Sequence, residues 1–138
     1  MKDITADEDF EIRVQFIPTK NMRYDTLGDY RWDQGQLLVQ IAQEGDFMER
    51  MAILLHELAE WAFVHRDKIP FSKVDEWDFS HPDSPEPGEE VGCPYRQAHI
   101  AAIGVEQTFR VYANIPDIEK GHTENEEQDS ASKYLRVD

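Results

Sequence analysis

Apolar and polar residues alternate along the first part of the chain. Residues 10–16 have a strict period of two, which is typical of a half-buried strand, and Pro18 ends this pattern. Two further strands are predicted at about residues 30–33 and 36–42, with residues 33–35 as the turn between them. We therefore predict a small antiparallel sheet near the N-terminus.

The pattern changes after Gly45. Asp46 is a suitable N-cap for a helix over residues 47–65, and Glu49 is placed as its capping-box partner. This segment is apolar nearly all the way round, which indicates a buried helix. A short helix or turn is predicted over residues 72–79.

A second buried helix is predicted from about Pro94 to Ala113, after a loop rich in proline and glycine at residues 80–94. These elements predict the α+β class, with a small antiparallel sheet packed on two buried helices. We expect residues 1–116 to form a single metal-binding domain. Residues 117–138 are polar and acidic, with few apolar side chains to bury, and we expect a flexible tail there.

The overall charge is strongly acidic, with 29 Asp and Glu against 14 Lys and Arg and a formal net charge of −15. This charge disfavours nucleic acid and anionic membranes as partners and suits cations or basic partners. Cys93 is the only cysteine, so no intrachain disulfide can form, and a reducing cytoplasmic location is expected. No apolar run approaches the roughly 18 residues of a membrane span, and no signal peptide is evident.

Ionisable residues interrupt both apolar helices. His56 and Glu60 are four residues apart and share one helix face, with Glu57 beside them, as in the H-E-x-x-H metalloprotease helix but with glutamate in place of the second histidine. His99 and Glu106 are seven residues apart and share a face of the second helix. We predict a metal site with His56, Glu60 and His99 as ligands and Glu106 as a fourth ligand or an outer carboxylate.

This ligand set predicts a divalent metal ion and a hydrolytic reaction. Catalytic zinc sites use three protein ligands and keep one position open, so zinc is the first candidate. Two histidines and a carboxylate also bind non-haem iron, and iron and manganese are the alternatives. Glu57 is the predicted general base, and Tyr95, one turn before His99, is a candidate donor to a developing oxyanion. The predicted substrate is a peptide or a small molecule.

A set of short motifs resembles a family of short proteins encoded by phages and prophages, over about residues 54–110. The matching residues are His56-Glu57-x-x-Glu60, Val74-Asp75-x-Trp77-Asp78, Glu86-Pro87-Gly88, Pro94-Tyr95, His99 and Glu106. The resemblance implies a phage context, a shared site and a location in the host cytoplasm. The order of elements is also similar to that of zincin metallopeptidases, which implies a zincin-like layout.

Three alternatives to a hydrolase fit the same sequence. The histidines and glutamates could form a buried hydrogen-bond network without a metal. They could hold a structural metal ion with four protein ligands and no open position. The chain could instead be a non-catalytic acidic phage effector that binds a host protein or mimics a polyanion.

Overall fold

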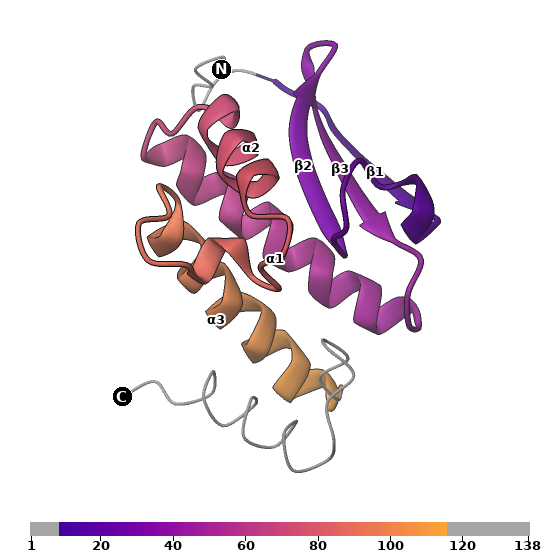
Figure 1. The fold of residues 1–138 in the computed structure, drawn as a ribbon. Coiled ribbons are helices and arrows are strands. Elements are labelled where there is room, and N and C mark those ends of the chain that lie inside the picture. Colours follow the sequence, from indigo (N-terminus) through magenta and orange to yellow (C-terminus); the bar gives the residue numbers. More distant parts are fainter. Residues whose placement is uncertain (1–8, 116–138) are drawn as a thin grey trace.

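The computed structural model describes residues 9–115, in which three strands are followed by three helices (Figure 1). The strands are β1 (Ile12–Ile17), β2 (Gly28–Asp33) and β3 (Gln36–Ala42), and the α-helices are α1 (Phe47–Arg66), α2 (Phe71–Ser80) and α3 (Arg96–Ala113). Two short 3₁₀ turns, η1 (Thr19–Asn21) and η2 (Pro87–Glu89), lie in the connections. The α+β class is confirmed. The boundary predicted at residue 116 and the predicted tail lie outside the described residues and stay predictions.

The sheet is mixed, so the predicted antiparallel sheet is wrong. Its strand order is β1-β3-β2, with β1 parallel and β2 antiparallel to β3. The chain crosses from β1 to the far side of β3 before β2 begins, which leaves β3 in the centre. The sequence of β3 accounts for this position, because Leu37, Leu38 and Val39 are consecutive and all buried. A continuous apolar run is typical of a strand covered on both faces.

Strand β1 is an edge strand and is less buried than its alternating pattern predicted. Ile12 and Val14 are 43% and 36% exposed, and of β1 only Phe16 packs against the hydrophobic core cluster. The turn predicted at residues 33–35 is confirmed. Gln34 and Gly35 both have positive φ, the conformation that a tight two-residue hairpin requires.

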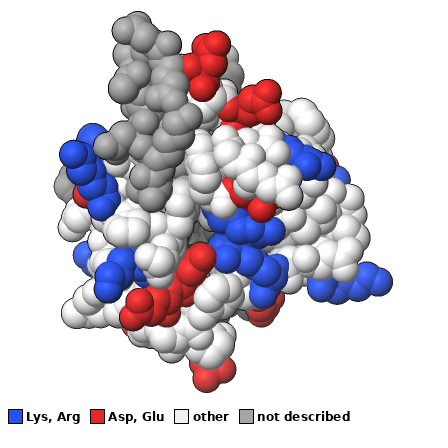
Figure 2. Space-filling view, turned by 90° about the horizontal axis from the view of Figure 1, so that it is seen from above, with Lys and Arg blue, Asp and Glu red and all other residues white. Residues whose placement is uncertain are grey.

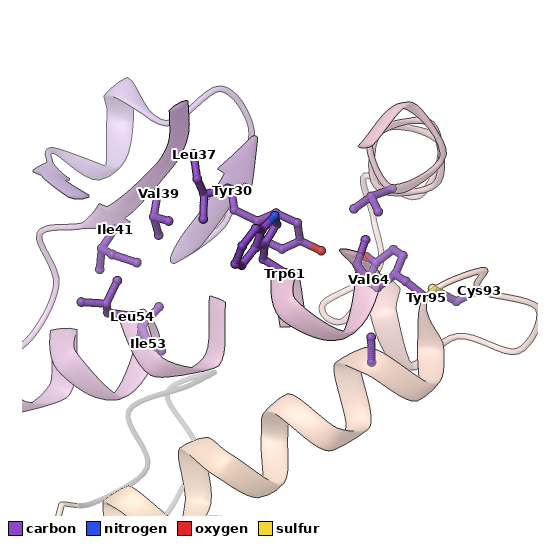
Figure 3. Packing of buried hydrophobic residues seen from close by; sticks show 12 residues of the cluster. Tyr30, Leu37, Val39, Ile41, Ile53, Leu54, Trp61, Val64, Cys93 and Tyr95 are labelled. Atoms are coloured by element: carbon purple, nitrogen blue, oxygen red, sulfur yellow. The ribbon is translucent and has the colours of Figure 1, made fainter. Parts of the chain in front are cut away.

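Helix α1 lies between the sheet and α3 (Figure 1). Leu37, Val39 and Ile41 point from β3 toward this helix, and all three are inaccessible to solvent (Figure 3). Ile53 and Leu54 meet them from α1. The side of α1 that contacts the sheet is therefore an apolar core.

The ends of α1 and α3 have local causes. The Asp46 side chain accepts a hydrogen bond from the backbone N–H of Glu49 at 2.9 Å, which confirms the predicted N-cap. Asn114 adopts the left-handed conformation, which ends α3.

Among residues 9–115, no helix combines the length and apolar character needed to cross a membrane.

Helix α2 is fixed to the sheet by one arginine. The guanidinium of Arg23 binds both oxygens of Asp29, at the start of β2, and both oxygens of Asp75 in α2, at 2.6–3.0 Å. Planar guanidinium groups suit such paired contacts with carboxylates. Arg23 thereby fixes the position of α2 beside the candidate site.

Candidate metal centre

Helix α1 carries two ionisable side chains that face the interior. His56 and Glu60 lie one turn apart and are only 7% and 6% exposed. Burial of such groups costs free energy unless each finds a partner. Two of their partners, His99 and Glu106, come from α3, which packs alongside α1.

His99 of α3 meets both residues of α1. Oε2 of Glu60 lies 3.3 Å from Nε2 of His56 and 2.8 Å from Nδ1 of His99. One potential ligand atom from each of the three residues lies within 4.8 Å of the other two, and all three residues are buried. The structure therefore brings together the three side chains predicted as metal ligands.

The donor set fits a divalent metal ion. Two imidazole nitrogens and one carboxylate oxygen are typical ligands of zinc and of non-haem iron. In a tetrahedral site with bonds of about 2.0–2.2 Å, ligand atoms lie roughly 3.3–3.6 Å apart. Small side-chain movements from the 2.8 and 3.3 Å separations would reach this spacing.

Glu106 of α3 binds the nitrogen of His56 that faces away from Glu60, and its predicted role as a fourth ligand or an outer carboxylate stays a prediction. The Nδ1–H of His56 donates to Oε1 of Glu106 at 2.9 Å, and Arg110 donates from Nε to Oε2 of Glu106 at 2.7 Å. This contact directs Nε2 of His56 toward Glu60. An outer carboxylate that fixes the orientation of a histidine is a common feature of metal sites.

Tyr30 of β2 binds the oxygen of Glu60 that does not contact the histidines. Its hydroxyl donates to Oε1 of Glu60 at 2.9 Å, which leaves Oε2 between the two histidines. Burial by itself raises the pKa of Glu60, but the hydrogen bonds with His56 and His99 outweigh burial and lower the pKa to about 2. Glu60 is therefore an anion at neutral pH, as a metal ligand must be.

The charges around the site favour a cation. Burial lowers the pKa of His56, but hydrogen bonds with Glu106 and Glu60 outweigh it and leave the pKa well above its ordinary value. Burial, followed by the charge of Glu60, raises the pKa of Glu57 well above its usual range. The shift of His56 means that the carboxylates around it favour a positive charge at this position.

Glu57 packs between the cluster and β2. Its Oε2 lies 4.0 Å from Nε2 of His56. Its side chain packs against Gly28 of β2, where any larger residue would collide with it. A Cβ added to Gly28 would lie 2.7 Å from Cγ of Glu57, too close for any real contact. Gly28 thus allows Glu57 to stand beside the three candidate ligands.

A cavity of about 370 Å³ opens onto the cluster. His56, Glu57, Glu60 and His99 all line it, so the three candidate ligand residues and the candidate base share one cavity. Its volume lies in the range of small-molecule sites. Among the described residues that line the cavity, none is Lys or Arg.

Tyr95 lines the same cavity, but its hydroxyl donates to Asp78 of α2. Tyr24 donates to the other oxygen of Asp78 at 3.2 Å. Burial raises the pKa of Asp78 to about 6, even though the bonds from the two tyrosines lower it. Because its proton is directed to Asp78, the Tyr95 hydroxyl does not point to His56, Glu60 and His99, and its predicted oxyanion role stays a prediction.

Comparison of the chain with protein-family models, curated proteins and solved structures found no match. The resemblance to phage proteins therefore stays a prediction. The zincin-like layout is not confirmed either, and the mixed sheet differs from the predicted antiparallel one.

Three residues of the site were not predicted as site residues. Tyr30 holds Glu60, Glu86 lies 3.6 Å from the second nitrogen of His99, and Gly88 packs against the His99 ring. Glu86 and Gly88 belong to the Glu-Pro-Gly motif, which was a usable signal. Tyr30 had no such signal, because it lies 30 residues from Glu60 on a different element.

Proposed function

We propose that this protein binds one divalent metal ion through His56, Glu60 and His99 and uses it to hydrolyse an amide bond. The observation that carries the proposal is that these three residues bring their ligand atoms close together and line one cavity with Glu57. A structural site would have four protein ligands and no access, and the cavity supports an open site instead.

Glu57 is the proposed general base. A bound divalent ion supplies Lewis-acid catalysis for the hydrolysis of a carbonyl substrate. Burial, followed by the charge of Glu60, raises the pKa of Glu57 well above its usual range, and the charge of His56 only partly opposes this shift. A raised pKa makes Glu57 a stronger base, which suits a carboxylate that accepts a proton from water. Glu57 would take the proton from the attacking water and pass it to the leaving amine.

The lining of the cavity supports a peptide or another uncharged amide as the substrate. Sites for phosphate groups rely on Lys, Arg or backbone donors, and no Lys or Arg is present among the described lining residues. Zinc is the first metal in this proposal, with iron and manganese as alternatives. A phage origin and a host cytoplasmic location rest on the sequence resemblance alone.

The test of this function compares wild-type protein with Glu57→Gln, both loaded with the same metal. Hydrolysis of a mixture of fluorogenic peptides should fall by at least about 100-fold in the variant, while metal content stays the same. Glu76→Gln, an exposed change on α2, is the matched control and should keep full activity. Undiminished hydrolysis by Glu57→Gln would exclude Glu57 as the base.

The acidic effector remains the second candidate, because the net charge of −15 suits a basic partner. On the face shown in Figure 2, acidic and basic side chains are interspersed among uncharged ones, without one continuous acidic surface in the described part. This candidate expects salt-sensitive binding to a basic host protein that Glu57→Gln leaves unchanged. Deletion of the residues after Pro116 should abolish such binding and spare a hydrolase.

A further inference from the structure

His99 differs from His56 in how its second nitrogen is held. His56 uses Nδ1 to bind Glu106 and turns Nε2 to Glu60. His99 turns Nδ1 to Glu60, and its buried Nε2 has no hydrogen-bond partner within 3.5 Å among the described residues. A carboxylate oxygen, Oε2 of Glu86, lies 3.6 Å from this nitrogen.

The ring of His99 cannot move far, because the segment around η2 is packed against it. A Cβ on Gly88 would lie 2.6 Å from Cγ of His99 and 2.8 Å from Nδ1, so the backbone of Gly88 lies directly on the ring. The segment is tied to α2, since the indole of Trp77 donates from Nε1 to the carbonyl of Pro87 at 2.8 Å. It is tied to α3 as well, where Arg96 donates from Nε to the carbonyl of Glu89 at 3.2 Å.

A neutral imidazole carries one proton, and a nitrogen that binds a metal cannot carry it. In the described structure Nδ1 of His99 lies 2.8 Å from the anionic Glu60, a distance at which this nitrogen carries the proton and donates it. When Nδ1 becomes a ligand, that proton is lost and the neutral ring carries its proton on Nε2 instead. The Nε2–H then needs an acceptor, and Glu86 is the carboxylate placed beside it.

We infer that Glu86 is a positioning residue, which accepts the Nε2–H of His99 and so commits Nδ1 to the metal; this inference rests on the metal site proposed above. A shift of a few tenths of an ångström brings the 3.6 Å separation into hydrogen-bond range. The Glu86 side chain is 23% exposed and lines the cavity beside His99. Glu86 would then serve His99 as Glu106 serves His56.

The test measures Zn²⁺ affinity of full-length protein by competition with a chromophoric chelator. Glu86→Ala should weaken binding by about 10-fold to 100-fold, the usual effect of losing an outer partner of a ligand histidine. Glu86→Gln should recover part of this loss, because its amide oxygen still accepts a hydrogen bond. Glu90→Ala removes the same charge from an exposed position of the same loop and should bind like wild type.

Imidazole ¹⁵N NMR of the zinc-loaded protein gives a readout that a loss of folding would not mimic. In wild type, His99 should show a protonated Nε2 and a zinc-bound Nδ1, and Glu86→Ala should show exchange between ring states. Unchanged affinity and unchanged His99 signals in Glu86→Ala would overturn the inference, as would an equal loss in Glu90→Ala. Wild type that binds no Zn²⁺ at all would refute the proposed metal site, and this inference with it.

Discussion

The two sides of α1 are built from opposite kinds of residue. Toward the sheet, Ile53 and Leu54 pack on fully buried aliphatic side chains of β3 (Figure 3). Toward α3, the same helix presents His56 and Glu60, and the Glu60 carboxylate contacts His99. These ionisable residues are buried about as fully as the aliphatic ones. The apolar contact between α1 and the sheet stabilises the fold. The ionisable contact between α1 and α3 is better explained by a function.

Energetics support this division. Full burial of a Leu, Ile or Val side chain contributes about 1.5–3 kcal/mol, so the interface between sheet and α1 is a main source of stability. Buried ion pairs give little net stability, because desolvation offsets most of their attraction. The cluster of His56, Glu60, His99 and Glu106 therefore adds little to the free energy that holds α1 and α3 together. Metal binding would explain why this cluster replaces an apolar contact.

The largest effect on stability is expected from the apolar side. Leu37→Ala removes a fully buried side chain of β3 and should lower the free energy of unfolding by about 2–5 kcal/mol. Metal affinity of the folded protein should stay unchanged, because Leu37 is not among the residues that line the cavity. Urea denaturation and metal titration on the same preparation check both expectations. Loss of metal binding with little loss of stability would contradict the division between the two sides.

A smaller effect is expected from Gly88→Ala, on the polar side. The new Cβ would lie 2.6 Å from Cγ of His99, so either the ring or the η2 segment must move. We expect metal affinity to fall by about tenfold or more, in line with the loss of a group that orients a ligand. Competition titration measures the change. Wild-type affinity in Gly88→Ala would show that the position of His99 is not important for binding.

The smallest effect is expected from Gly104→Ala, which is also the matched control for Gly88→Ala. Gly104 lies in α3, and a Cβ there would meet nothing within 4 Å. Alanine is favoured over glycine inside a helix by about 1 kcal/mol, so thermal stability should rise slightly while metal affinity stays the same. Thermal denaturation with and without metal tests this. A drop in affinity would mean that the exposed side of α3 contributes to the site.

Local patterns in the sequence predicted the helices and the core of the site well. The Asp46 cap and the hairpin turn at residues 33–35 depend on neighbouring residues, and both predictions are confirmed. Helical spacing placed His56 with Glu60, and the apolar surroundings of His99 indicated that it also faces inward. The structure brings the three residues into one group.

Long-range pairing could not be predicted in the same way. The alternating pattern of β1 defines a strand but not its partner, so the parallel pairing with β3 was missed. Exposure of Ile12 and Val14 follows from the edge position of β1, which the pattern alone does not reveal. Tyr30 and Glu86 reach the site from separate elements, and no spacing rule connects them to His99 or Glu60.

We propose that His56, Glu60 and His99 hold one metal ion. The metal content of the purified protein tests this most directly. Protein purified without chelator should contain about one divalent ion per chain, measured by inductively coupled plasma mass spectrometry. His56→Ala and His99→Ala should each lose most of it, while His65→Ala, on α1 outside the group, should keep it. Equal metal content in all four proteins, whether near zero or near one, would contradict the claim.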